Sequence, residues 1–154
     1  MNQFFDRQWP DLPLRGGALP YRHNQAQQLE FLLIRRTDQA VWSLPKGHPS
    51  ADLPLHRTAV IEAFEEAGVE GEVDEIPLGS FLYRKTNGSL LGHKVVEVVT
   101  FPLRVTRELQ SWPEVDMRLR QWTSLEHAES SVAPGQLPEL LRKLDRMLSE
   151  AAIG

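Results

Sequence analysis

Residues 46–69 read KGHPSADLPLHRTAVIEAFEEAGV. Residues 46–53 are rich in turn-forming residues and predict a loop. Residues 55–67 contain no proline or glycine, and Gly68 then supplies the left-handed residue at which helices commonly end. The stretch therefore predicts a loop followed by a helix over residues 55–67.

The predicted helix has an apolar side and an acidic side. On a helical wheel the apolar side gathers Ala59, Val60, Ala63, Phe64 and Ala67. The opposite side carries Glu62, Glu65 and Glu66, whose spacings of three and four residues make their carboxylates neighbours. Like charges at these spacings repel, and the last turn of a helix disfavours anions. Either the glutamates form a solvated acidic face, or they bind a hard cation such as Mg²⁺ or Mn²⁺.

Further residues frame these glutamates at fixed spacing. From Gly47 the sequence reads Gly47-x5-Leu53-x7-Ile61-Glu62-Ala63-x-Glu65-Glu66-x-Gly68-Val69. This pattern resembles the Nudix box, G-x5-E-x7-R-E-U-x-E-E-x-G-U, in which U is a bulky aliphatic residue. Leu53 and Ile61 depart from the box, which has Glu and Arg at those two positions.

The resemblance extends over roughly residues 15–145. It includes RGGALPYR at 15–22, WSLPKG at 42–47, GSF at 79–81 and the stretch from Trp112 to Trp122. These segments are similar to bacterial Nudix proteins akin to diadenosine polyphosphate and diphosphoinositol polyphosphate hydrolases. The resemblance implies an α/β fold, an α/β/α sandwich with a mixed β-sheet, in one domain over residues 15–150. Residues 1–14 are expected to form an irregular N-terminal segment.

The resemblance also implies an activity, namely metal-dependent hydrolysis of a pyrophosphate bond in a nucleoside-diphosphate-linked or polyphosphate substrate. Glu62, Glu65 and Glu66 would hold Mg²⁺, with Mn²⁺ as the alternative, and Glu65 or Glu66 would serve as the catalytic base. The substitutions at Leu53 and Ile61 favour a second hypothesis, a catalytically impaired domain that senses nucleotides or binds a protein. A third hypothesis is an RNA 5′-pyrophosphohydrolase.

Cationic side chains near the predicted site are candidates for binding phosphate. Together with Gly47 at the loop entrance, the substrate-binding candidates are Lys46, Arg15, Arg22, Arg35, Arg84, Arg118 and Arg120. Arg118 and Arg120 are two residues apart on a predicted strand and so share a face. Guanidinium groups suit phosphate oxygens, but a structural pairing with Glu114 or Asp116 fits these two arginines equally well.

The remaining sequence predicts strands and a closing helix around residues 46–69. Alternating or apolar stretches predict strands at 17–22, 29–36, 41–44, 71–77, 79–86, 94–103 and 117–122. Asn87-Gly88 predicts a tight turn, and residues 105–117 a loop. Ser124 is expected to cap a short helix, and residues 137–148 to form an amphipathic closing helix. Trp42, Phe64, Trp112 and Trp122 are expected in or near the core, with base stacking open to one near the site.

Glu97 interrupts an apolar strand, Val95-Val96-Glu97-Val98-Val99. A solvent-exposed strand position is the favoured interpretation, and a metal ligand or base the alternative.

Composition excludes several classes of protein. The 154 residues include no cysteine, which rules out disulfides and Cys-ligated metal sites. The net charge of −4 gives no support to nucleic-acid binding, which is expected to be absent. No apolar run approaches the length of a membrane span, and no signal peptide is evident. A cytoplasmic monomer or homodimer that acts on a small polyphosphate, without a membrane partner, is the resulting expectation.

Overall fold

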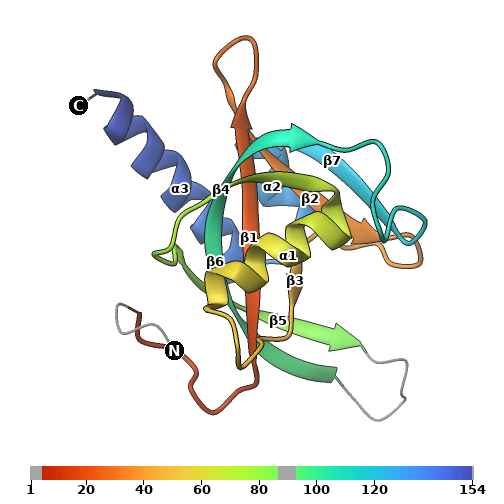
Figure 1. Ribbon diagram of the computed structural model, residues 1–154. Coiled ribbons are helices and arrows are strands. Elements are labelled where there is room, and N and C mark those ends of the chain that lie inside the picture. The colour runs from red at the N-terminus through yellow and green to blue at the C-terminus, as the bar shows by residue number, and fades with distance from the viewer. Residues whose placement is uncertain (1–4, 87–92, 154) are drawn as a thin grey trace.

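The computed structural model of the chain describes residues 5–86 and 93–153 (Figure 1). The predicted Asn87-Gly88 turn lies outside these residues. The elements are β1 Leu14–His23, β2 Leu29–Arg36, β3 Lys46–Gly47, α1 Leu55–Ala67, β4 Val69–Val73, β5 Gly79–Thr86, β6 His93–Glu108, β7 Arg118–Ser124, α2 Leu125–Ser131 and α3 Gln136–Ile153.

The described strands form a mixed seven-stranded sheet in the order β4-β6-β1-β2-β7, with β3 paired to β1 and β5 to β6. The central strands β1 and β6 run parallel, and the other pairings among the described strands are antiparallel. β1 pairs with β3 near its start and with β2 near its end, so the sheet divides there. This division leaves the start of β1, together with β3, free to face α1.

Helices cover both faces of the sheet (Figure 1). One core lies under α1 and includes Leu32, Ala59, Ala63 and Phe101. The other lies under α2 and α3 and includes Phe31, Phe81, Leu141 and Leu144. The expected α/β/α sandwich with a mixed sheet is therefore confirmed. Among the described residues, no helix is long and apolar enough to cross a membrane.

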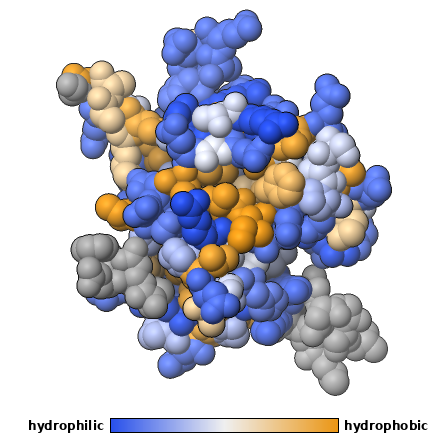
Figure 2. All heavy atoms as spheres, viewed as in Figure 1, coloured by the Kyte–Doolittle hydropathy of each residue, from blue (hydrophilic) through white to orange (hydrophobic). Residues whose placement is uncertain are grey.

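Helix α1 has the predicted bounds but a different buried face. Gly68 ends it at φ 65°, and its N–H reaches back to the carbonyls of Ala63 and Phe64. Ala59, Ala63 and Ala67 are buried as expected, but Phe64 is 37% exposed and Glu66 only 7%. The buried face of α1 therefore includes Glu66 in place of Phe64. Glu66 is held there because its carboxylate accepts hydrogen bonds from the Lys46 N–H on β3 and from Arg118 on β7. Figure 2, seen from the side of α1, shows apolar side chains gathered near the middle of this face.

Several strand and helix bounds differ from the predictions. β6 continues through Glu108, where the sequence predicted a loop from residue 105, because its last residues pair with β4. β4 ends at Val73 instead of residue 77. Residues 41–44 form only isolated bridges, at Trp42 and Ser43. β1 begins earlier than predicted, and α3 continues five residues further than residue 148.

Glu97 is fully buried, so the prediction of a solvent-exposed position is wrong. Its carboxylate accepts hydrogen bonds from Arg7 Nε at 2.9 Å, the Gln8 N–H at 3.0 Å and Ser80 Oγ at 2.6 Å. Residues 5–13 form no helix or strand, yet through Arg7 they supply the cation that neutralises this buried carboxylate. The segment before β1 is thus tied to the sheet.

Candidate active site

A cleft of about 890 Å³ opens beside α1. It is bounded by β1, β3, β5, α1 and the segment leading into β7. Its lining residues are Arg15, Arg36, Asp38, Gln39, Lys46, Gly47, His48, Glu62, Glu65, Glu66, Tyr83, Lys85, Val96, Glu114 and Arg118. All three box glutamates thus line one cleft with four of the other predicted site residues, Lys46, Gly47, Arg15 and Arg118.

Glu66 is the most deeply held of the three glutamates. Its Oε1 accepts the Lys46 N–H at 3.2 Å, and its Oε2 lies 3.3 Å from Arg118 Nη2. Arg118 Nε also pairs with Glu114 Oε1 at 3.0 Å, which confirms the structural pairing considered for this arginine. Burial raises the pKa of the Glu66 carboxyl, against the opposing effect of Lys46 and Arg118.

Glu62 lies against the backbone of Gly47. A Cβ at position 47 would overlap the Glu62 carboxylate and come within 2.7 Å of its Cγ. Glycine here allows the close approach of the Glu62 carboxylate, which would have to shift if position 47 carried a Cβ. Burial, followed by repulsion from Glu66 and Glu65, raises the pKa of Glu62 to about 7.

Lys46 lines the cleft, and its side chain is held by neighbouring protein groups. Its Nζ donates to Ser43 Oγ at 3.2 Å and to the Leu44 carbonyl at 3.0 Å, and it lies 3.9 Å from the centre of the Tyr83 ring. Burial lowers its pKa to about 8, with Glu66 opposing the shift. The ammonium is thus oriented by protein groups next to the carboxylates.

The cleft is also lined by basic residues. Arg15 is 8% exposed, and its Nη1 donates to the carbonyl of Leu14 at 2.9 Å. Burial lowers the pKa of Arg15. The pKa of His48 is lowered first by the charge of Arg15, then by burial and by Lys85 and Lys94. Several cations therefore act on one region beside the carboxylates.

Two of the predicted arginines have structural partners outside the cleft. Arg22 pairs with Glu30 at 2.9 Å and stacks on Trp122 at 3.9 Å. Arg120 Nη1 donates to the carbonyls of Ala67 and Gly68 at 2.8 and 3.2 Å, which closes the C-terminal end of α1. Both arginines stabilise the fold around the cleft without lining it.

Arg35 and Arg84 also lie outside the cleft lining. Arg35 Nη1 donates to the Gln39 carbonyl at 2.7 Å, which holds the turn after β2. Arg84 is exposed and lines a neighbouring pocket on β5.

The carboxylates suit a cation that keeps part of its water shell. Among residues 5–86 and 93–153, no three His, Cys, Asp or Glu side chains meet as a ready-made metal site. Mg²⁺ commonly takes one or two protein carboxylates and completes its shell with waters and substrate phosphates. Glu62 and Glu66 provide such a pair, and their mutual repulsion would be relieved by a cation.

Tyr83, Glu114 and His48 are among the cleft residues that the sequence did not predict as part of the site. Glu114 and Tyr83 reach the cleft only because β7 and β5 are brought beside α1 and β3. His48 directly follows Gly47, and this adjacency was an available signal. Trp112, whose Nε1 donates to the Glu66 carbonyl at 3.1 Å, also supports α1 from outside the core.

The sequence matches the NUDIX domain family over residues 14–145, so the chain belongs to the Nudix family. It is 33% identical over 119 residues to Nudix hydrolase 4 of Arabidopsis thaliana, covering 73% of this chain and 55% of that protein. It is 34% identical over 117 residues to Nudix hydrolase 21, chloroplastic, of the same plant, covering 73% and 56%. The match thus spans little more than half the length of these curated relatives.

Solved structures show the same fold. The chain aligns with a Caenorhabditis elegans Ap4A hydrolase binary complex at TM-score 0.69 and 24% identity, over 90% of this chain and 99% of that one. It aligns with the NUDIX domain of Shewanella oneidensis NrtR complexed with ADP ribose at TM-score 0.63 and 17% identity, over 89% and 88%.

Proposed function

We propose that this protein is a metal-dependent pyrophosphohydrolase acting on a nucleoside-diphosphate-linked or polyphosphate substrate, with diadenosine and diphosphoinositol polyphosphates as the favoured classes. The observation that carries the proposal is the cleft in which Glu62, Glu65 and Glu66 face a group of cations. Acidic groups can hold a metal cation, and neighbouring basic groups can neutralise the phosphate charges that this cation leaves unpaired. This combination suits a substrate with several phosphates.

Different residues of the cleft would have different roles in the reaction. Glu62, Glu65 and Glu66 would hold Mg²⁺ or Mn²⁺, which supplies charge neutralisation and a more acidic water when bound. Glu65 or Glu66 accepts the proton of the attacking water. Arg118 orients the Glu66 carboxylate, and Gly47 lets Glu62 approach the loop. Lys46 and Arg15 position the phosphate oxygens.

Arg118 also bears on the departure from the Nudix box. The resemblance assigns the box Arg the task of orienting carboxylates, and Ile61 cannot do this. The pairing of Arg118 with Glu66 and Glu114 supports an alternative source of that guanidinium, from β7 instead of α1. This pairing favours the hydrolase over the sensor hypothesis.

The test is an assay of phosphate and nucleotide release with Mg²⁺ and with EDTA. The panel contains diadenosine polyphosphates, diphosphoinositol polyphosphates, ADP-ribose, dinucleotide cofactors, nucleoside triphosphates and a 5′-triphosphate RNA. We expect turnover of one class that EDTA and Glu66→Gln both abolish. Ligand binding without turnover of any substrate would overturn the proposal and favour the sensor. Preference for the RNA would favour the RNA 5′-pyrophosphohydrolase.

A further inference from the structure

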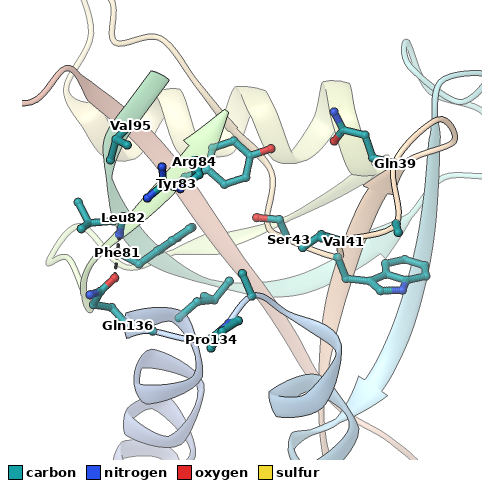
Figure 3. Close-up of a pocket in the computed structure, with 15 residues that line it drawn as sticks. Gln39, Val41, Ser43, Phe81, Leu82, Tyr83, Arg84, Val95, Pro134 and Gln136 are labelled. Carbon is teal, nitrogen blue, oxygen red and sulfur yellow. Dashed lines mark hydrogen bonds between the residues drawn. The ribbon is translucent and has the colours of Figure 1, made fainter. Parts of the chain in front are cut away.

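Three tryptophans within residues 5–86 and 93–153 each lie close to an arginine guanidinium, but only one of them donates a hydrogen bond to α1. The pairs, with the distance from guanidinium to ring centre, are Trp42 with Arg35 at 5.3 Å, Trp112 with Arg120 at 4.0 Å and Trp122 with Arg22 at 3.9 Å. Trp42 lines the pocket of about 700 Å³ between β5 and residues 133–137 (Figure 3). The Trp122 indole N–H donates to Glu108 Oε2 at 3.2 Å. The Trp112 indole N–H donates instead to the Glu66 carbonyl, in the last turn of α1, at 3.1 Å.

The C-terminal end of α1 receives its hydrogen-bond donors from the chain that leads into β7 and from β7 itself. The last four carbonyls of a helix have no partner within the helix. In α1 the Gly68 N–H serves the first of these carbonyls, that of Phe64, at 3.1 Å. The next three are served from outside the helix, by the Glu114 N–H to Glu65 at 3.0 Å, the Trp112 indole to Glu66 at 3.1 Å and Arg120 Nη1 to Ala67 at 2.8 Å. Residues 112–120 therefore hold the last turn of α1.

Two of these carbonyls belong to residues whose side chains form the proposed site. Glu65 and Glu66 both line the cleft. Glu114 joins their backbone to their side chains, because its N–H holds the Glu65 carbonyl while its carboxylate pairs with Arg118, which contacts Glu66 Oε2. A shift of the last turn would therefore move both carboxylates relative to Glu62, which lies one turn earlier in the same helix.

Trp112 is packed directly against the end of the helix. A Cβ added to Gly68 would lie 2.6 Å from Cδ2 of the Trp112 ring and 2.8 Å from Arg120 Nη1. The last turn of α1 contains no basic residue, although the C-terminal end of a helix disfavours the negative charges of Glu65 and Glu66. The indole N–H and the guanidinium oppose this effect, since both place positive charge at the carbonyls that end the helix.

We infer that Trp112 is a positioning residue for the reaction, which holds the Glu66 carbonyl and thereby fixes the direction of the Glu65 and Glu66 carboxylates. Trp112 does not line the cleft, so it acts through the helix and not on the substrate. This inference rests on the proposed function and adds to it a residue outside the cleft. Displacement of catalytic groups by about 1 Å lowers turnover by up to about 100-fold, and loss of a group that orients metal ligands lowers metal affinity to a similar extent.

The test compares Trp112→Phe with a matched control, Trp122→Phe. Each substitution keeps an aromatic ring beside an arginine and removes one indole hydrogen bond, but only Trp112→Phe removes a donor from α1. Steady-state kinetics with Mg²⁺ on the substrate class that turns over, and calorimetry with Mn²⁺ alone, are measured well below the melting temperature of both variants. We expect Trp112→Phe to lower kcat and Mn²⁺ affinity by about 10-fold each, with KM changed less than about threefold. Trp122→Phe should change each of these quantities by less than about twofold, because the end of α1 keeps all its donors.

A merely structural role of Trp112 would lower the melting temperature of both variants and leave kcat and Mn²⁺ affinity alike in the two. That result would overturn the inference. If Trp112→Phe fails to fold, benzothienylalanine at position 112 tests the same point, because its ring sulfur replaces the indole N–H at nearly unchanged ring size. Wild-type protein that binds Mn²⁺ without turnover of any substrate would overturn only the proposed function, since the Mn²⁺ comparison still decides the role of Trp112. Turnover with equal effects of the two substitutions would overturn only this inference.

Discussion

Two buried glutamates, Glu66 and Glu97, both pair with an arginine, but their surroundings differ. Glu97 is enclosed by three donors from Arg7, Gln8 and Ser80. Glu66 has donors from Lys46 and Arg118 on one side and lines an open cleft with Glu62 and Glu65 on the other. Burial alone therefore does not mark a functional carboxylate. What marks it is a cluster of like charges left accessible to a ligand.

The largest expected effect is on catalysis at Glu66. Glu66→Gln keeps an acceptor for the Lys46 N–H but removes the charge and the proton acceptor. We expect kcat/KM to fall by about 10²–10⁴-fold. The free energy of unfolding should fall less than for the same substitution at Glu97, because Arg118 keeps its pairing with Glu114. Steady-state kinetics and thermal unfolding measure the two. Retention of activity within tenfold would remove Glu66 from the catalytic role.

Glu97 should behave in the opposite way. Glu97→Gln leaves the Arg7 cation without its carboxylate, and losing one partner of a buried pair costs several kcal/mol. Because Arg7 is 18% exposed, we expect a smaller loss of about 2–3 kcal/mol in unfolding free energy. The activity of the folded protein should change less than about threefold.

A matched control for this effect is Glu30→Gln. Glu30 pairs with Arg22 at the same 2.9 Å distance, but both side chains are partly exposed. Such a pair contributes at most about 1 kcal/mol. Equal losses for Glu97→Gln and Glu30→Gln in urea unfolding would contradict the structural role of Glu97.

The same contrast shows what the sequence could predict. The spacing of Glu62, Glu65 and Glu66 was informative because one helix fixes their relative positions, and Gly47 accompanies them through a short loop. The Arg7–Glu97 and Arg118–Glu66 contacts join segments 90 and 52 residues apart. Their formation depends on strand order and register, which local spacing does not specify.

Residue type alone also did not predict which arginines line the cleft. Arg118 and Arg120 share a face as predicted, yet only Arg118 lines the cleft, because Arg120 meets the carbonyls that end α1. A guanidinium can donate to a phosphate, a carboxylate or a carbonyl oxygen. The partner is decided by position along the strand: Arg118 contacts the Glu66 side chain, and Arg120, two residues further, contacts the carbonyls of Ala67 and Gly68.

A pH dependence of stability offers an intermediate test. The Glu62 pKa is raised from 4.5 to about 7, so between these values the folded carboxyl keeps a proton that the unfolded one has lost. The unfolding free energy contributed by this group therefore falls as pH rises through this window. In EDTA, Glu62→Gln should be more stable than wild type at pH 7.5 by about 1–2 kcal/mol, allowing for solvent screening at this half-buried group.

Below about pH 4 the two proteins should be equally stable, because Glu62 is then protonated in both states. Urea unfolding across pH 4–7.5 measures the difference, and Glu97→Gln, whose carboxylate is enclosed by donors, serves as the comparison. A difference between Glu62→Gln and wild type that does not grow with pH would show that burial and the neighbouring carboxylates do not raise the pKa of Glu62 in the folded protein.

The smallest expected effect concerns Ile61, where the chain departs from the Nudix box. Ile61 is 41% exposed and does not line the cleft, while Arg118 already contacts Glu66. Ile61→Arg should therefore change kcat/KM by less than about threefold and stability by about 0.5 kcal/mol or less. Kinetics and thermal unfolding measure both quantities. Ile61→Ala, measured in parallel, shows the effect of losing the isoleucine side chain without adding a charge. A tenfold gain in activity would mean that Arg118 orients Glu66 incompletely, and that α1 lacks a cation which the Glu66 site needs.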